Sequence, residues 1–150
     1  MTPDRKQARR HLDARLMPLS TLTSEPRPHR GWIRAIRDAL GMSGTELAQR
    51  MGVRQQVVHQ FERNEVNGSI KLDTLRRVAD NLNCEFVYFL IPRQSLTETV
   101  KIQATRKARE HLEPVEHHSK LEDQEPALAD REAQLTELAE QLIDRKGLWS

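Results

Sequence analysis

The 150-residue sequence predicts a mostly α-helical fold with a compact centre and more solvated helical arms. Apolar residues recur at spacings of three and four in several segments, which is the period of an amphipathic helix. Charged residues make up 31% of the chain and hydrophobic residues 37%, which is lean for one core that buries everything. The few aromatic residues lie mostly in the middle of the chain: Trp32, Phe61, Phe86, Tyr88 and Phe89.

The net charge of +2 hides a division along the chain. Residues 1–77 hold 15 Lys and Arg against 8 Asp and Glu, and residues 78–150 hold 9 against 14, so the two parts carry +7 and −5. A basic segment attracts a polyanion, whereas an acidic one suits a protein partner or simple solubility.

The first 19 residues predict a helical extension, followed by a linker over residues 20–30. Residues 4–19 read as a helix, and residues 26 and 28 of the linker are prolines, which favour an extended chain. The basic residues of the helix either touch phosphate or form a solvated face. The apolar stripe is Ala8, Leu12, Leu16 and Leu19, and the basic residues are Arg5, Lys6, Arg9 and Arg10.

We expect residues 31–92 to form a second segment, with four short helices between Gly31 and Asn83. Gly41, Gly52 and the turn at 67–68 separate these helices. Residues 84–91 form a β-branched and aromatic run that Pro92 stops, which predicts a short strand, with a buried helical turn as the alternative.

Residues 93–150 predict a helical C-terminal region for dimerisation or partner binding. A helix begins with the capping box of Ser95 and Glu98 and ends at Pro114, and residues 116–125 form a polar loop. A final helix follows, with Pro126 in its first turn, and extends toward Gly147. Leu121, Leu128, Leu135 and Leu142 are spaced by sevens, which we interpret as packing within the fold rather than as a zipper.

The stretch from Gly44 to Arg63 has the pattern of two helices that meet across a tight turn. Ala48 is small enough for the second helix to approach closely, and Gly52 can begin the turn with a positive φ. Together with the apolar positions, this spacing predicts a helix-turn-helix unit. The inward-facing residues are Leu47, Met51, Val53, Val58 and Phe61.

The outer face of the second helix is polar and suits DNA. Glutamine offers a donor and an acceptor together, which match N6 and N7 of adenine in the major groove. The sequence therefore predicts binding to double-stranded DNA, with base contacts from Gln55, Gln56, His59 and Gln60.

Residues 32–83 resemble the Cro/repressor type of helix-turn-helix, the five-helix fold of lambdoid phage repressors. The run from Gln55 to Glu62 is especially similar to a phage repressor recognition helix. The resemblance implies base reading by the three glutamines and a buried ion pair between Arg37 and Glu62. Gly44 stands where the family has a buttressing glutamine, and Asn64 where it has a glycine after the recognition helix. The expected phosphate contacts are Ser43, Arg54, Asn64, Ser69 and Lys71.

A narrower resemblance, to the bacterial family called mobile mystery protein A, covers nearly the whole chain. The residues that carry it are 27–37, 41–42 and 84–92. Its members are encoded beside a Fic-domain protein, often on mobile elements, which implies an antitoxin-like or autoregulatory role. The inhibitory signature of known Fic antitoxins is absent, because the near match from Thr21 to Glu25 is followed by Pro26.

Several other classes of function are disfavoured. His111, His117 and His118 have no acidic or cysteine partner at a metal-binding spacing, and Cys84 is the only cysteine. We expect no metal, no cofactor and no enzyme, because no nucleophile with a base and no phosphate loop occur. The amino terminus lacks a signal peptide and no apolar run could span a membrane, so we expect a cytoplasmic protein.

Two hypotheses for function follow. The first is a transcriptional repressor of its own operon, which binds a palindromic operator as a homodimer beside the gene of a Fic-domain protein. The alternative is an antitoxin or adaptor whose main ligand is a Fic toxin bound by residues 93–150.

Overall fold

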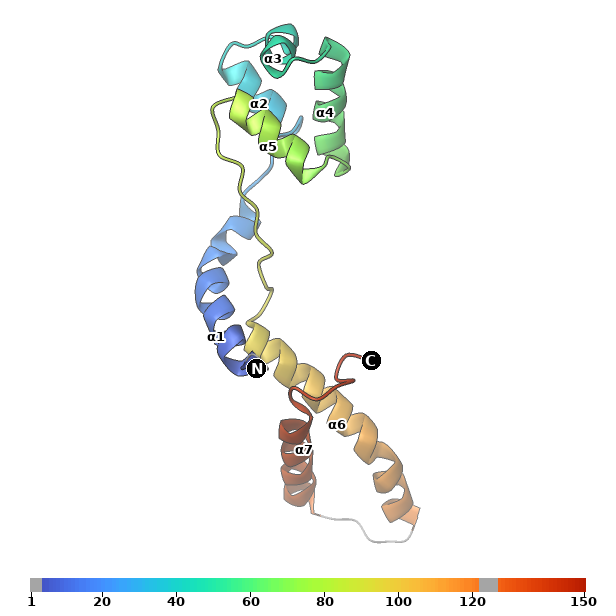
Figure 1. Ribbon diagram of the computed structural model, residues 1–150. Helices are drawn as coiled ribbons and strands as arrows, with labels where there is room; N and C mark the ends of the chain where they lie inside the picture. Colours follow the sequence, from blue (N-terminus) through green and yellow to red (C-terminus); the bar gives the residue numbers. More distant parts are fainter. Residues whose placement is uncertain (1–3, 122–126) are drawn as a thin grey trace. The chain divides into compact units, whose positions relative to one another are not determined.

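The computed structural model describes residues 4–121 and 127–150 (Figure 1). The chain forms two compact units, one of Met1–Thr23 with Leu90–Ser150 and the other of Ser24–Phe89. Seven α-helices and one 3-10 helix make up the regular structure of the described residues, which contain no strand. The prediction of a mostly helical protein is confirmed.

The N-terminal helix is shorter than predicted. α1 spans Arg5–Leu16, with the Asp4 carboxylate accepting from the backbone N–H groups of its first turn. The chain then tightens into the 3-10 helix η1, Met17–Ser24. Pro18 has no N–H for the α-helical bond four residues back, which explains why α1 stops before it. Residues 20–24 are therefore helical, although the sequence predicted a linker there.

Four helices form the Ser24–Phe89 unit: α2 (Trp32–Ala39), α3 (Gly44–Met51), α4 (Gln55–Asn67) and α5 (Leu72–Asn81). The resemblance predicted a five-helix fold, but this unit has no fifth helix, because the chain after α5 is irregular. The core residues come from all four helices and the residue after α5. They are Ile33, Leu47, Ala48, Val58, Val78 and Leu82.

The helix α4 is longer than the resemblance implied. Asn64 was expected after the recognition helix, but it lies inside α4. The left-handed position that ends the helix falls instead on Gly68, with φ of 75°. Its side-chain-free backbone adopts this conformation at little cost, and its N–H bonds back to the last turn.

The strand predicted at residues 84–91 is absent, and so is the alternative helical turn. A strand needs hydrogen bonds to a neighbouring strand, and none of the described residues supplies one. Cys84 is half-buried against the core of the unit, whereas Val87, Tyr88 and Leu90 are exposed. The apolar composition of this run thus reflects neither a sheet nor a buried turn.

The C-terminal region contains α6 (Leu96–Leu121) and α7 (Leu128–Leu142). Small side chains lie at their contact: Ala104 and Ala108 of α6 and Ala139 of α7 are buried, which lets the helices approach closely. Leu128 is 78% exposed, so the prediction that the leucines spaced by sevens pack within the fold is wrong at this position. The leucines that belong to this core cluster are Leu135, Leu138, Leu142 and Leu148.

Pro114 does not end its helix, contrary to the prediction. A proline inside a helix removes one backbone bond, here to the carbonyl of Glu110. Both residues are exposed, so water can satisfy the freed carbonyl. Residues 116–121 of the predicted loop are consequently helical, whereas the remainder of that loop and Pro126 lie outside the described residues.

A carboxylate on α1 caps the N-terminus of α6. Asp13 accepts hydrogen bonds from the backbone N–H groups of Leu96 at 2.6 Å and Thr97 at 3.2 Å, and from the Thr97 hydroxyl at 2.8 Å. Desolvation is the largest single influence and raises the pKa of Asp13, but these hydrogen bonds together lower it below its ordinary value. Asp13 therefore favours folding in its ionised form and ties α1 to α6.

We predict that Asp13→Asn lowers the unfolding midpoint of this unit by a few degrees at pH 7. Because the folded pKa is depressed, the stabilisation is present above the unfolded pKa of about 3.9. It is lost as pH falls through the folded value, so wild type and variant should converge in acid. Thermal unfolding followed by Trp149 fluorescence, in a Trp32→Phe background, measures this. Glu140→Gln, at an exposed position of α7, is the control, and equal midpoints for wild type and Asp13→Asn at pH 7 would contradict the cap.

Candidate nucleic-acid interface

The helices α3 and α4 meet across a short turn whose inner face is apolar. Gly52 ends α3 in the left-handed conformation, with φ of 66°. Leu47 and Val58 are fully buried where the two helices face each other. The other predicted inward residues, Met51, Val53 and Phe61, pack against the same core. The arrangement leaves the opposite face of α4 open to solvent.

A buried ion pair fixes α4 to α2. Arg37 Nε lies 2.7 Å from Glu62 Oε1, and the two side chains are 8% and 7% exposed. Arg37 also donates to the backbone carbonyl of Met42 at 3.0 Å, in the connection between α2 and α3. One guanidinium thus joins α2, α4 and the connection that leads to α3.

A second carboxylate of α4 caps the N-terminus of α2. Glu65 accepts from the backbone N–H groups of Trp32 at 2.8 Å and Ile33 at 3.0 Å. A Cβ at Gly31 would lie only 2.5 Å from Glu65 Oε1, so this position admits the carboxylate because it is glycine. Glu65 follows Glu62 by three residues, so both carboxylates project from the same side of α4. Sequence reasoning missed Glu65, because its partners lie more than 30 positions away.

The predicted base-reading glutamines are exposed on the outer face of α4. Gln60 donates to Asn64 Oδ1 at 2.7 Å and accepts from Arg63 Nη2 at 2.8 Å. These bonds orient its amide one turn along the helix from Gln56. Asn64, expected to contact phosphate, therefore serves in this structure as a partner of Gln60.

His59 lies between the buried ion pair and Gln55. Its Nδ1 is 3.7 Å from Glu62 Oε2, and its Nε2 is 3.4 Å from Gln55 Nε2. A Cβ at Gly44 would lie 3.3 Å from the imidazole Cε1, so the glycine makes room for the ring. A side chain at position 44 would therefore crowd the imidazole that lies beside Gln55.

The residues expected to contact phosphate differ in their surroundings. Arg54 and Lys71 are exposed and precede α4 and α5 directly, and Ser69 is exposed in the connection between these helices. Ser43 is engaged in a capping box: its hydroxyl accepts from Glu46 N at 3.1 Å, and its N–H donates to Glu46 Oε2 at 2.6 Å. Those hydrogen bonds lower the pKa of Glu46, which keeps a negative charge next to Ser43.

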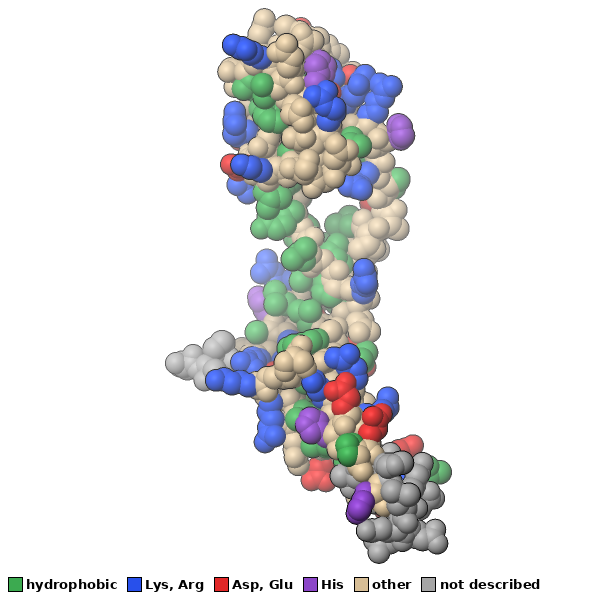
Figure 2. Space-filling view, turned by 90° about the vertical axis from the view of Figure 1, so that its right-hand side faces the viewer, with side chains coloured by type: hydrophobic (Ala, Val, Ile, Leu, Met, Phe, Trp, Pro, Cys, Tyr) green, Lys and Arg blue, Asp and Glu red, His purple; other side chains and the backbone are tan. Residues whose placement is uncertain are grey.

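Basic side chains also flank α4 on the side toward α2. Figure 2 shows the face of the unit that includes α4, where Lys and Arg side chains are more prominent than acidic ones. Arg30, Arg34 and Arg63 line a hollow of about 460 Å³ together with His29 and His59. The acidic residue in this hollow, Glu62, is already paired with Arg37. Sequence reasoning did not single out Arg30 or Arg34, because their relation to α4 depends on the packing of α2.

The comparison with protein families agrees with this geometry. A family model described as helix-turn-helix matches residues 33–89. Residues 33–89 are thus similar to helix-turn-helix domains. This match supports a DNA-binding regulator. It does not test the narrower resemblance to mobile mystery protein A, which stays a prediction. No curated protein and no solved structure matches the chain.

Two further findings concern the described part of the chain. None of its helices is long and apolar enough to cross a membrane. No three of its His, Cys, Asp and Glu side chains lie together in a way that could hold a metal ion.

We predict that Glu62→Ala destabilises the helix-turn-helix unit by about 3 kcal/mol, because it removes the buried counter-charge of Arg37 and leaves only the more exposed Asp38, 3.4 Å away. Arg37→Ala should destabilise the unit to a similar extent, because it leaves the buried Glu62 carboxylate without the guanidinium. Urea unfolding of both variants measures the effect, with Glu85→Ala as the control at an exposed position. Unchanged stability in both buried-site variants would mean that the pair does not hold α4 in place.

Proposed function

We propose that this protein is a sequence-specific transcriptional repressor that places α4 in the major groove of DNA. The observation that carries the proposal is the outer face of α4, where Gln55, Gln56 and Gln60 are exposed. The opposite side of the same helix is held by the Arg37–Glu62 pair. A rigidly mounted helix with exposed amides can present them to base edges without ordering the helix on binding.

Base reading is assigned to the three glutamines. Gln56 and Gln60 are separated by four residues, so both project from one side of the helix. Gln55 lies in the first turn of α4, and helix-turn-helix domains approach bases with the N-terminal residues of this helix. A bidentate amide rewards adenine by about 1–3 kcal/mol over other bases. His59 is assigned two roles: its main role is to orient Gln55, and it can also contact a base.

Phosphate contacts are assigned to Arg54, Ser69 and Lys71. Arg54 and Lys71 directly precede the first turns of α4 and α5, where unpaired backbone N–H groups favour anions. Ser43 and Asn64 are weaker proposals, because Glu46 and Gln60 already engage them. Gln60 for its part exchanges its bonds to Asn64 and Arg63 for bonds to a base. Arg30 and Arg34 are added, since they line the hollow beside α4.

The proposed mode of regulation is a homodimer that binds a palindromic operator upstream of its own gene. Two copies of α4 would enter successive major grooves on one side of the DNA and exclude polymerase. The resemblance to mobile mystery protein A supports an operon that also encodes a Fic-domain protein. Footprinting on the DNA upstream of the gene tests this assignment.

The second candidate function is an antitoxin or adaptor for a Fic toxin. It is favoured by the separate core of the unit that contains α6 and α7, which is distinct from the core of the helix-turn-helix unit. In that case the protein partner binds the C-terminal helices, and DNA binding is secondary. Co-purification of the full chain with the neighbouring gene product distinguishes the two candidates.

We predict that the two groups of DNA-contacting residues fail differently when mutated. Gln56→Ala or Gln60→Ala should cost about 1–3 kcal/mol on the footprinted site and little on scrambled DNA. Lys71→Ala should weaken both complexes together and reduce the slope of log affinity against log salt by about one unit. Fluorescence anisotropy measures the affinity of each variant for the footprinted site and for scrambled DNA, at two salt concentrations.

Glu85→Gln serves as the control for these measurements, because it alters an exposed polar residue away from α4. The assignment of base reading is wrong if the ratio of specific to scrambled affinity survives alanine at Gln55, Gln56 and Gln60 together. An affinity for DNA that does not change with salt would remove the phosphate assignment.

A further inference from the structure

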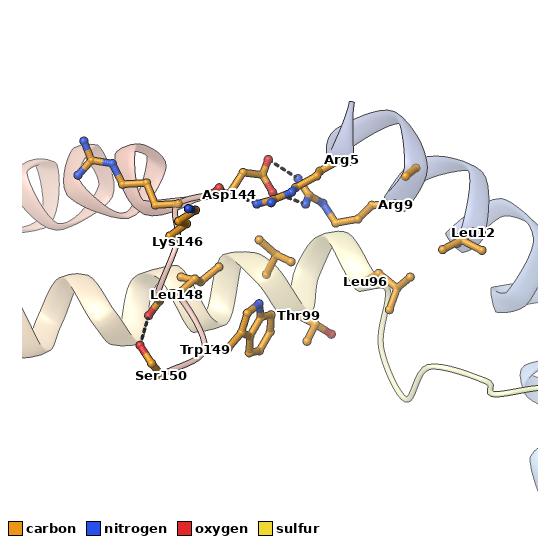
Figure 3. A pocket seen from close by; sticks show the side chains of 14 residues that line it. Arg5, Arg9, Leu12, Leu96, Thr99, Asp144, Lys146, Leu148, Trp149 and Ser150 are labelled. Atoms are coloured by element: carbon orange, nitrogen blue, oxygen red, sulfur yellow. Dashed lines mark hydrogen bonds and ion pairs between the residues drawn. The ribbon is translucent and has the colours of Figure 1, made fainter. Parts of the chain in front are cut away.

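A cavity of about 910 Å³ lies within the unit formed by Met1–Thr23 and Leu90–Ser150. Its walls are α1, the beginning of α6 and the segment after α7 (Figure 3). Cavities of roughly 300–1,000 Å³ are the size that proteins use to bind small molecules. The helix-turn-helix domain does not contribute to it.

The segment after α7 is fastened in place at several points. Arg9 pairs with the Asp144 carboxylate at 2.6 Å, and Arg5 donates to the Asp144 carbonyl at 2.7 Å. Further along, Gln103 of α6 donates to the Leu148 carbonyl at 2.6 Å, and the Leu148 side chain is only 6% exposed. The side-chain hydrogen bond from Arg9 also lowers the pKa of Asp144, so this pair stays charged. The wall is therefore built by specific contacts and is not a loose tail.

The interior of the cavity is apolar and includes an exposed aromatic ring. Ala8 and Leu12 of α1 and Leu96 and Val100 of α6 contribute apolar side chains to its lining. Trp149 is 63% exposed, and Figure 3 shows its indole against α6 near Thr99. An exposed aromatic ring at an apolar cavity can stack against the flat body of a ligand.

The charges along the same lining are unbalanced. Arg5, Arg9, Arg145 and Lys146 line the cavity together with one acidic residue, Asp144. Asp144 pairs with Arg9 and also attracts Arg5, so four basic side chains against one acidic side chain give the lining a net charge of +3 around an apolar interior. An apolar cavity lined by positive charge complements a molecule that has a hydrophobic body and a negative group.

We propose that this cavity binds a small organic anion with an aromatic body, of the class of aromatic carboxylates and sulfonates. The aromatic body lies against Trp149 and the aliphatic side chains of α1 and α6. The anionic group lies toward Arg5 and Lys146. Such a site gives the protein a small-molecule ligand that its DNA-binding domain does not account for.

The test uses the full chain with Trp32→Phe, which leaves Trp149 as the sole tryptophan. The probe is 8-anilinonaphthalene-1-sulfonate, an aromatic anion that accepts energy from tryptophan. We expect saturable one-to-one binding with energy transfer from Trp149. N-phenyl-1-naphthylamine, which has the same rings without the sulfonate, should bind more weakly.

Two variants locate the binding. Ala8→Phe fills the cavity from α1 and should abolish dye binding while the circular dichroism spectrum stays unchanged. Lys146→Gln should weaken the anionic dye about fivefold, the factor that roughly 1 kcal/mol of exposed ion pairing gives, and leave the neutral dye unaffected. Lys101→Gln, which removes the same charge from an exposed position of α6 outside the cavity, should change neither dye.

The proposal is overturned if the anionic dye binds equally well to the Ala8→Phe variant, because the dye then occupies another surface. It is also overturned if the neutral dye binds as tightly as the anionic one. If no dye binds at millimolar concentration and the chain self-associates through Trp149, a second copy covers the cavity instead. None of these outcomes depends on DNA binding.

Discussion

The buried pair between Arg37 and Glu62 is the interaction on which the position of α4, and with it the proposed DNA-binding surface, depends. Two charges with less than a tenth of their side chains exposed tolerate little displacement, since separating them would deprive each of its main buried partner. The pair therefore sets where α4 sits on α2. The imidazole of His59 lies between this carboxylate and the Gln55 amide, at 3.7 Å from Glu62 Oε2 and 3.4 Å from Gln55 Nε2.

Both units also use a carboxylate from one helix to cap the N-terminus of another. Glu65 of α4 holds the start of α2, and Asp13 of α1 holds the start of α6. A helix N-terminus carries unpaired N–H groups and a positive partial charge, so an anionic acceptor satisfies both at once. Because each cap joins segments distant in the sequence, it acts as a tertiary contact as well as a helix cap. Small units with lean apolar cores gain fixed geometry from such contacts.

The sequence predicts the local features of this fold well and the non-local ones poorly. Period and glycine positions are enough to predict the four helices of residues 31–83 and the inner face from Leu47 to Phe61. The strand expected at 84–91 fails because strand formation depends on a partner that local composition cannot reveal. The predicted helix end at Pro114 is wrong because an exposed helix position tolerates the loss of one backbone hydrogen bond. The cap by Glu65, and the space that Gly44 leaves for His59, follow from packing between helices and have no local pattern.

The central claim is that α4 reads DNA sequence from this fixed position. Selection of bound duplexes from a random pool by the full-length chain tests it most directly. We expect enrichment of one near-palindromic motif, with half-site centres about 10 base pairs apart or a multiple of that spacing. Adenine preferences within each half-site should disappear when Gln55, Gln56 and Gln60 are all replaced by alanine. A pool that remains random after selection, or a motif that the triple variant enriches unchanged, would contradict the account.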